Sequence, residues 1–471
     1  MTQHADKPGP EPCGAPVPAP AAEAAPLPGV LGALGARFRA LPAARRGISA
    51  LVTGTAVGQV VGVLTSPVLT RLYGPADLGA LAVYAALVSM LAVVVCGRYE
   101  LAINVCASET EAANVLALSL LSALLLSALS VGAVLLGAEA VATAAGAPEL
   151  AWALWLLPLS LVGVGTYNAL ACWAIRGSGY GRLARTRATQ GLSLTAVQLG
   201  LGAVGLVPAG LFLGDAVSRS SGVGTLARAT WREDRKALRQ VSWQGMMQAA
   251  HRYRRFPLYG SGSALMNTLA LEVPVFFLAL HYSTRVTGDY ALVQRLLAVP
   301  LVMLGRAVAT YYVGEGTRRL RTSPRTLRPL FRRTVLQLAL YGGLPLCLGG
   351  LLCPWLVPLV FGSAWHEAGR YALVVSVLAA VQLVAVPVSG TLNFLERQGL
   401  QLAWDAGRLA LVLGSLGLAF ALGASPMVAI ITFAAAMSLA YLALLAMAAR
   451  AVRAATAQHL LAGATGEREE A

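Results

Sequence analysis

Charged side chains inside long apolar stretches are the residues of this sequence best placed to do chemistry. Glu272 lies near the middle of the stretch 258–280, and Arg295 and Arg306 lie in the next stretch, 289–312. A charge in apolar surroundings costs several kcal/mol unless it faces water or a partner, so such residues mark candidate binding sites. Because their 11-residue spacing makes close to three helical turns, the two arginines share one helix face about 16 Å apart. This spacing predicts a cationic track for an anionic ligand.

Simpler interpretations of these charges stay open. Long arginine side chains can snorkel, so Arg306 could reach the basic boundary of its stretch and Arg295 the opposite boundary. Asp215 and Arg219 stand four residues apart in the stretch 208–226, where they can pair along one helix face. We predict that Asp215 and Arg219 form a structural ion pair.

The elements that must position these residues are helices that cross a membrane. The sequence is 57% hydrophobic and only 12% charged, which is more apolar surface than a soluble core can use. A run of ~20 apolar residues crosses a ~30 Å hydrocarbon core as a helix, and the alternation of a membrane barrel is not visible. About twelve stretches approach this length: 48–70, 78–97, 112–136, 152–175, 189–206, 208–226, 258–280, 289–312, 334–361, 369–395, 402–422 and 426–449. We therefore predict an all-α polytopic membrane protein with about 12 transmembrane helices.

The basic residues fall into every second gap between these stretches. About 31 of the 36 Lys and Arg residues belong to one set of gaps and the two tails. Basic residues in short loops stay on the cytoplasmic side, so both termini are predicted to be cytoplasmic. The formal net charge is +15, but these residues flank membrane spans with few interleaved aromatics, so we expect membrane lipids and no nucleic acid as partners.

The same pattern divides the chain into five segments. We predict a disordered, Pro- and Ala-rich cytoplasmic tail with a basic interfacial segment at 1–46, and a second cytoplasmic tail at 450–471. Between them we predict two six-helix lobes at 47–226 and 258–449, joined by a basic cytoplasmic linker at 227–257.

A weak internal repeat supports the two lobes. Tyr73 and Gly79 bracket the first outer turn, and Tyr282 and Gly288 bracket the turn after the seventh stretch, with the same spacing of six residues. A repeat offset by six helices predicts two pseudo-symmetric lobes that face each other across a ligand path.

Catalytic and metal-binding patterns are not found. The six cysteines lack the paired spacing of a zinc or redox site, the five histidines are scattered, and there is no phosphate-binding GxxxxGK[ST] motif. We expect that the protein is not an enzyme and has no metal and no cofactor.

Four short sequence motifs occur along the chain. They are LTRLYGP at 69–75 with Asp77 and Gly79, RYELA at 98–102, RYRRFP at 252–257 and FGSAWHEAGRY at 361–371. Together they resemble the bacterial polysaccharide-biosynthesis flippases, the Wzx-type members of the multidrug/oligosaccharidyl-lipid/polysaccharide exporter superfamily. The resemblance covers roughly residues 45–450.

This resemblance implies a substrate and a path. A polyprenyl-diphosphate-linked oligosaccharide would cross the bacterial cytoplasmic (inner) membrane for capsule, exopolysaccharide or O-antigen (lipopolysaccharide) synthesis, with a polysaccharide polymerase and a chain-length regulator as partners. Arg98, Arg295, Arg306 and Glu272 are then the candidate substrate-binding residues. Arg98 either meets the diphosphate or neutralises Glu100, and Glu272 is the candidate for coupling to protons or sodium.

Two other functions stay open. A cation or drug antiporter of the same superfamily would need a cavity dominated by carboxylates, whereas the embedded charges here lean basic. A membrane polysaccharide polymerase or ligase would normally place its catalytic residues in a sizeable outer loop, and every outer gap here is short.

Overall fold

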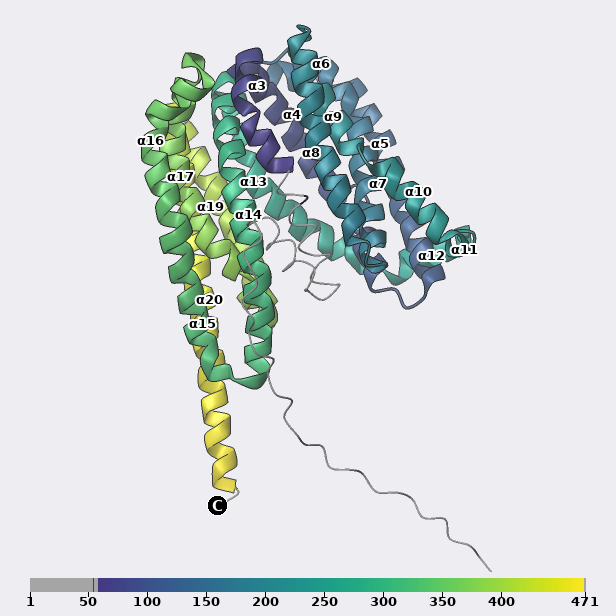
Figure 1. The fold of residues 1–471 in the computed structure, drawn as a ribbon, viewed down its shortest axis with the longest axis vertical. Coiled ribbons are helices and arrows are strands. Elements are labelled where there is room, and N and C mark those ends of the chain that lie inside the picture. The colour runs from purple at the N-terminus through teal and green to yellow at the C-terminus, as the bar shows by residue number, and fades with distance from the viewer. Residues whose placement is uncertain (1–53, 55–57, 470–471) are drawn as a thin grey trace, which may run out of the picture. The chain divides into compact units, whose positions relative to one another are not determined.

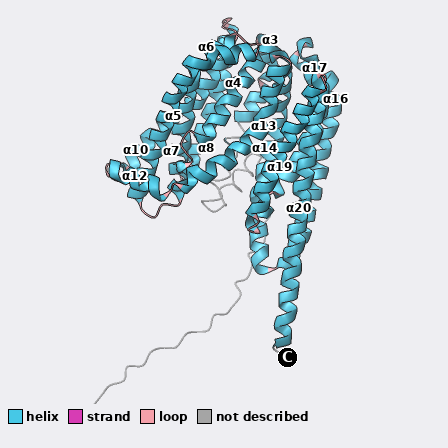
Figure 2. Cartoon of the chain, turned by 180° about the vertical axis from the view of Figure 1, so that it is seen from behind, coloured by secondary structure: helices cyan, strands magenta, loops and turns pink. Residues whose placement is uncertain are grey.

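A computed structural model of the protein describes residue 54 and residues 58–469. Every regular element in this part of the chain is a helix, and Figure 2 shows no strand among the described residues. The all-α prediction is therefore confirmed. The tail and interfacial segment predicted at 1–46 lie outside the described residues.

The helices follow one another through short connections, and Figure 1 labels most of them. In chain order they are α3 (Ser66–Leu72), α4 (Pro75–Val94), η1 (Tyr99–Asn104), α5 (Glu109–Ala144), α6 (Glu149–Ala153), η2 (Leu154–Leu156), α7 (Leu157–Arg176), α8 (Tyr180–Ala203), α9 (Ala209–Ser220), α10 (Val223–Glu233), α11 (Arg235–Leu238), α12 (Trp243–Arg252), η3 (Phe256–Gly260), α13 (Ser261–His281), α14 (Thr284–Thr322), η4 (Pro324–Thr326), α15 (Leu327–Leu338), η5 (Ala339–Gly343), α16 (Leu344–Phe361), η6 (Ser363–Trp365), α17 (His366–Val388), α18 (Gly390–Phe394), α19 (Gln398–Ala421) and α20 (Pro426–Glu469). Helical residues 58–64 precede α3.

Nine helical segments within the described residues are long and apolar enough to cross a membrane. They coincide with nine of the twelve predicted stretches, which confirms a multi-pass membrane protein. Of the other three, the stretch 48–70 lies partly outside the described residues. The stretch 189–206 falls in α8, whose first half carries three arginines, and the stretch 208–226 is divided between α9 and α10. The count of twelve stays a prediction.

Figure 1 shows α11 and α12, from the basic connection 227–257, at the lower right end of the helices around α5 and α7, and the basic connection 313–333 at the lower end of α14 and α15, on the same side as the end of α20. We call this side of the helices the basic end. The helices α3 and α6 lie at the top of the same view, which we call the opposite end. The gaps with many basic residues and the gaps with few thus correspond to two ends of one set of helices.

The helices α4 and α14 touch through two glycines near the opposite end. A Cβ atom on Gly79 would lie 1.7 Å from the carbonyl oxygen of Thr284, and one on Gly288 would lie 1.7 Å from that of Pro75. Each of these Cβ positions is also 2.9 Å from the backbone nitrogen of the other glycine. Only glycine permits such an approach. The two glycines paired by the sequence repeat therefore meet in one contact, called the glycine contact below.

The two repeat tyrosines make matching contacts. The Tyr73 hydroxyl donates to the carbonyl oxygen of Gln198 in α8 at 2.8 Å, and the Tyr282 hydroxyl donates to that of Ala424 after α19 at 2.8 Å. The helices α8 and α19 correspond to the fifth and eleventh predicted stretches. These contacts support a repeat offset by six spans.

The predicted linker 227–257 is largely helical and is held against the helices that precede it. It contains α11, α12 and most of α10. The Trp173 indole of α7 donates to Asp234 Oδ2 at 2.7 Å, and the Ser242 backbone nitrogen donates to Asn114 Oδ1 of α5 at 3.1 Å. These bonds fix the linker at the basic end.

Candidate functional site

A cavity of about 570 Å³ surrounds Arg295 of α14. The other walls come from residues 58–63 and from α7, α8 and α9. The polar and charged residues that line it are Gln59, Tyr167, Asn168, Arg187, Gln190, Asp215, Ser218, Arg219 and Arg295. We call it the arginine cavity.

Arg295 carries an uncompensated charge into this cavity. Its side chain is half-buried, and Nη2 donates to the carbonyl oxygen of Gly62 at 3.2 Å. It forms no salt bridge with any residue that the structure describes. A carbonyl satisfies one guanidinium N–H and leaves the charge available, so Arg295 can bind an anion that enters the cavity.

The remaining charges of the arginine cavity come from α8 and α9. Arg219 Nε lies 2.5 Å from Asp215 Oδ2, and Nη2 lies 3.2 Å from Oδ1, so the predicted partners form a two-pronged ion pair. The guanidinium of Arg187 lies 4.5 Å above the ring of Tyr167. Three arginines and one aspartate therefore give the lining a formal excess of two positive charges.

Arg306 does not line the arginine cavity. Its side chain is exposed. Pro300 lies inside α14 between Arg295 and Arg306, and a proline removes a helical hydrogen bond and bends the helix. The spacing of the two arginines on one face assumed a straight helix, so the cationic track stays a prediction.

Glu272 also lies outside the lining of the arginine cavity. It lies on α13 and forms no salt bridge with any described residue. A coupling role for Glu272 stays a prediction.

Arg98 lines a second cavity, of about 600 Å³, which we call the Arg98 cavity. Its other walls come from η3, α13, α17, α19 and α20. Gly97 and Arg98 have left-handed φ values of 57° and 59°, which turn the chain out of α4. The neighbouring Glu100 is 6% exposed, and burial raises the pKa of its carboxyl group. The structure therefore brings Arg98 and Arg295 to different cavities.

Three charged residues in these cavities were not identified from the sequence, namely Arg187, Asp405 and Arg408. Arg187 was counted with a loop because the fifth stretch was taken to begin at residue 189, whereas α8 begins at Tyr180. Asp405 and Arg408 lie in the predicted stretch 402–422 and were given no role, but the structure pairs them inside α19. The three-residue spacing of Asp405 and Arg408 is the signal that could have found them, by the same rule that paired Asp215 with Arg219.

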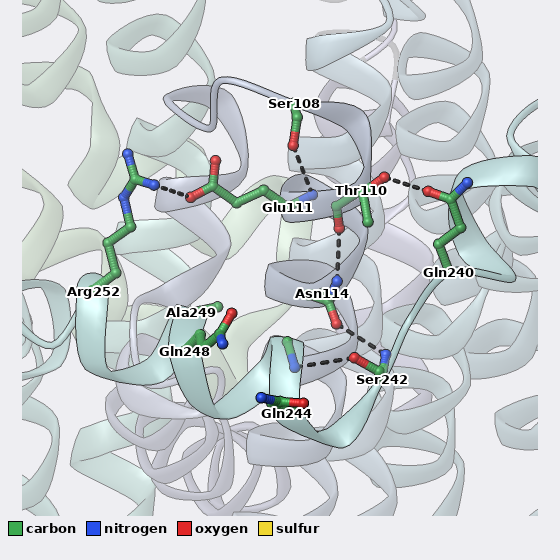
Figure 3. Close-up of a pocket in the computed structure, with 11 residues that line it drawn as sticks. Ser108, Thr110, Glu111, Asn114, Gln240, Ser242, Gln244, Gln248, Ala249 and Arg252 are labelled. Atoms are coloured by element: carbon green, nitrogen blue, oxygen red, sulfur yellow. Dashed lines mark hydrogen bonds and ion pairs between the residues drawn. The ribbon is translucent and has the colours of Figure 1, made fainter.

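A third polar cavity, of about 570 Å³, lies between the start of α5 and α12 (Figure 3). Arg252 Nη1 lies 2.9 Å from Glu111 Oε1. The Ser242 hydroxyl accepts from the Gly245 backbone nitrogen at 3.1 Å, and the Ser242 backbone bonds Asn114. Glu111 and Arg252, the two charged residues of this cavity, compensate each other, as the dashed line in Figure 3 shows. It joins the linker to α5 and offers no free charge.

Comparison with protein families gives one match. A model of the family described as polysaccharide biosynthesis protein matches residues 68–370, which is well over half of the chain. The sequence has no match among the curated proteins with which it was compared.

Solved structures with the same fold are membrane transporters and flippases. An inward-facing multidrug resistance MATE family transporter of the MOP superfamily is 13% identical with a TM-score of 0.64, covering 86% of this chain and 95% of that one. The lipid II flippase MurJ in an inward closed conformation is 10% identical with a TM-score of 0.62, covering 88% and 90%. A variant of the Vibrio cholerae MATE transporter VcmN is 16% identical with a TM-score of 0.55, covering 88% and 97%. At these identities the likeness establishes the fold.

Proposed function

The chain belongs to the polysaccharide biosynthesis protein family, and on that basis we propose that it is a flippase for polyprenyl-diphosphate-linked oligosaccharides. The substrate would cross the bacterial cytoplasmic membrane and supply capsule, exopolysaccharide or O-antigen synthesis. The shared fold with the lipid II flippase MurJ supports this proposal. No bond is made or broken in such a step.

The observation that carries the proposal is the charge of the arginine cavity. Its formal excess of two positive charges suits an anion, and Arg295 has no carboxylate partner among the described residues. An anion that moves outward across an inside-negative membrane gains about 2.3 kcal/mol per charge per 100 mV. A diphosphate with about two charges would gain roughly 4.6 kcal/mol per 100 mV, so membrane potential alone could drive its transport.

The cation or drug antiporter is the alternative within the same superfamily, and the fold shared with a multidrug resistance transporter keeps it open. A site for a cation needs uncompensated negative charge. Asp215 is the single carboxylate in the lining of the arginine cavity, and Arg219 compensates it. This charge balance favours an anionic substrate.

The glycine contact suggests how the helices move. It brings the main chains of α4 and α14 together near the opposite end, while Arg295 of α14 lines the arginine cavity and Arg98, which follows α4, lines the Arg98 cavity. We propose alternating access, in which the two predicted lobes, 47–226 and 258–449, rock around this region. Glu272 is our candidate for coupling this motion to protons or sodium.

The proposed orientation places the basic end and both termini in the cytoplasm. Positions in 227–257 and 313–333, replaced singly by cysteine, should react with a membrane-impermeant reagent only from the cytoplasmic side. A cysteine at the exposed position of Arg285, in the turn 282–288, should react from outside. Labelling of the two basic connections in intact cells would reverse the orientation.

A gene deletion tests the proposed function. Loss of the protein should cause a lipid-linked oligosaccharide to accumulate on the cytoplasmic face, as measured by mass spectrometry of extracted lipids. A polysaccharide polymerase and a chain-length regulator would then act on the flipped product. An unchanged lipid-linked pool, together with altered drug or cation resistance, would favour the antiporter.

A further inference from the structure

The Arg98 cavity contains an arginine that packing alone does not satisfy. Arg408 is 3% exposed, and its Nη2 donates to Asn267 Oδ1 at 2.6 Å and to Asp405 Oδ1 at 3.3 Å. Its guanidinium also lies 4.6 Å from the centre of the Trp404 ring. The Nε of Arg408 is buried and has no partner among the described residues. A buried donor without a partner is costly, which points to a missing acceptor.

Two further groups of the same cavity lack partners. The buried Nε of Arg98 has none, and its guanidinium donates no hydrogen bond to any described residue. Gln401 Nε2 approaches Asp405 Oδ2 at 3.4 Å, but the Gln401 Oε1 is buried without a donor. Arg98, Arg408 and Gln401 thus line one cavity, and each has a buried polar atom that no described residue satisfies. A bound molecule that reaches these groups would supply the missing partners.

The charge balance of this cavity differs from that of the arginine cavity. Arg98 and Arg408 are its cations and Asp405 is its anion, which leaves a formal excess of one positive charge. The arginine cavity has an excess of two. By charge complementarity a diphosphate suits the arginine cavity, whereas a group with a single negative charge suits the Arg98 cavity.

We propose that the Arg98 cavity binds a carboxylate-bearing sugar of the transported unit, which rests on the proposed flippase function. Arg98 and Arg408 hold the carboxylate, since guanidinium and carboxylate match as planar, two-pronged partners. The amides of Asn267, Gln382 and Gln401 line the same cavity, and amides both donate to and accept from sugar hydroxyls. The substrate class is thus an acidic oligosaccharide.

Binding of small probes to the purified full-length chain tests this site by isothermal titration calorimetry. Glucuronate is the acidic probe, glucose is its neutral counterpart, and pyrophosphate represents the diphosphate of the lipid carrier. Glucuronate should bind saturably and at least about tenfold more tightly than glucose, because only glucuronate offers a charged acceptor to the arginines. Failure of glucuronate to bind better than glucose would overturn the proposal.

Variants assign the binding to the cavity. Arg98→Gln should weaken glucuronate binding about tenfold or more, and it removes no hydrogen bond within the described residues. Arg397→Gln is the matched control, because Arg397 is exposed just before α19 and does not line the cavity. Equal losses in both variants, or none in Arg98→Gln, would contradict the site. So would pyrophosphate binding that depends on Arg98 and exceeds that of glucuronate.

The two proposals fail in different experiments. Accumulation of a lipid-linked oligosaccharide in the deletion strain without glucuronate binding would remove only the acidic-sugar site. The opposite pair of results is an unchanged lipid-linked pool in the deletion strain together with Arg98-dependent glucuronate binding by the purified chain. It would exclude the flippase function and leave the binding site standing.

Discussion

Replacing Arg295 is the most direct test of the arginine cavity. A hydrogen bond to a charged group contributes about 1.5–3 kcal/mol, so Arg295→Ala should weaken substrate binding about 10- to 150-fold. Its partner within the described residues is the carbonyl of Gly62, and loss of one such neutral bond costs only about 1 kcal/mol of stability. Arg295→Lys should retain part of the activity, because an ammonium keeps the charge and loses the planar fork.

The assay is polymer export in the deletion strain, with membrane abundance measured in parallel. Arg285→Ala is the matched control, since Arg285 is exposed on the same helix and lies outside the cavity. Export should fall strongly in Arg295→Ala at unchanged abundance, and it should be normal in the control. Full export by Arg295→Ala would remove Arg295 from the substrate path and favour the snorkelling interpretation.

Three further predictions concern the helix contact, the coupling carboxylate and a buried loop acid. Gly79→Ala should lower the thermal midpoint of unfolding in detergent, because overpacking costs about 1–3 kcal/mol. Gly314→Ala is the control and should leave the midpoint unchanged, since a Cβ atom there meets nothing within 4 Å. Equal midpoints of the two variants would contradict the glycine contact. Glu272→Gln should change the dependence of transport in proteoliposomes on proton or sodium gradients if Glu272 couples, and an unchanged dependence would exclude that role. Burial raises the pKa of Glu100 above its ordinary value of 4.5, so the ionised carboxylate is less stable in the folded than in the unfolded chain. The free energy of unfolding should therefore fall as the pH rises from below 4.5 through the pKa of the folded state. Glu100→Gln should lack that slope in thermal midpoints measured against pH, and an identical slope would assign it to another group.

Much of the fold was accessible from the sequence because lipid imposes simple rules. A span must be apolar, long and helical, and nine of the predicted stretches coincide with such helices. These rules predicted the helix bounds less accurately where polar residues enter a helix. Arg187 lies within α8, which is longer than its apolar part, so hydropathy placed the start of this helix too late.

The candidate sites were less predictable, because a cavity depends on packing between distant segments. The sequence marked Arg295 by its cost in an apolar stretch, and the structure places it in a cavity with Asp215 and Arg219. It could not show that Arg98 faces α13 and α19, which follow it by more than a hundred residues. Nor could it show that Arg408 points inward, since the spacing along one helix leaves the direction of its face undetermined.

The glycine contact gives two helices that are distant in the sequence a fulcrum. The α4 helix has 20 residues and is about 30 Å long. A rotation of roughly 10° about one end would displace its other end by roughly 5 Å, about one helical turn. At Gly79 and Gly288 themselves the two helices meet through main-chain atoms without side chains in between, so we expect α4 to act as a lever whose largest displacement falls at the end near Arg98.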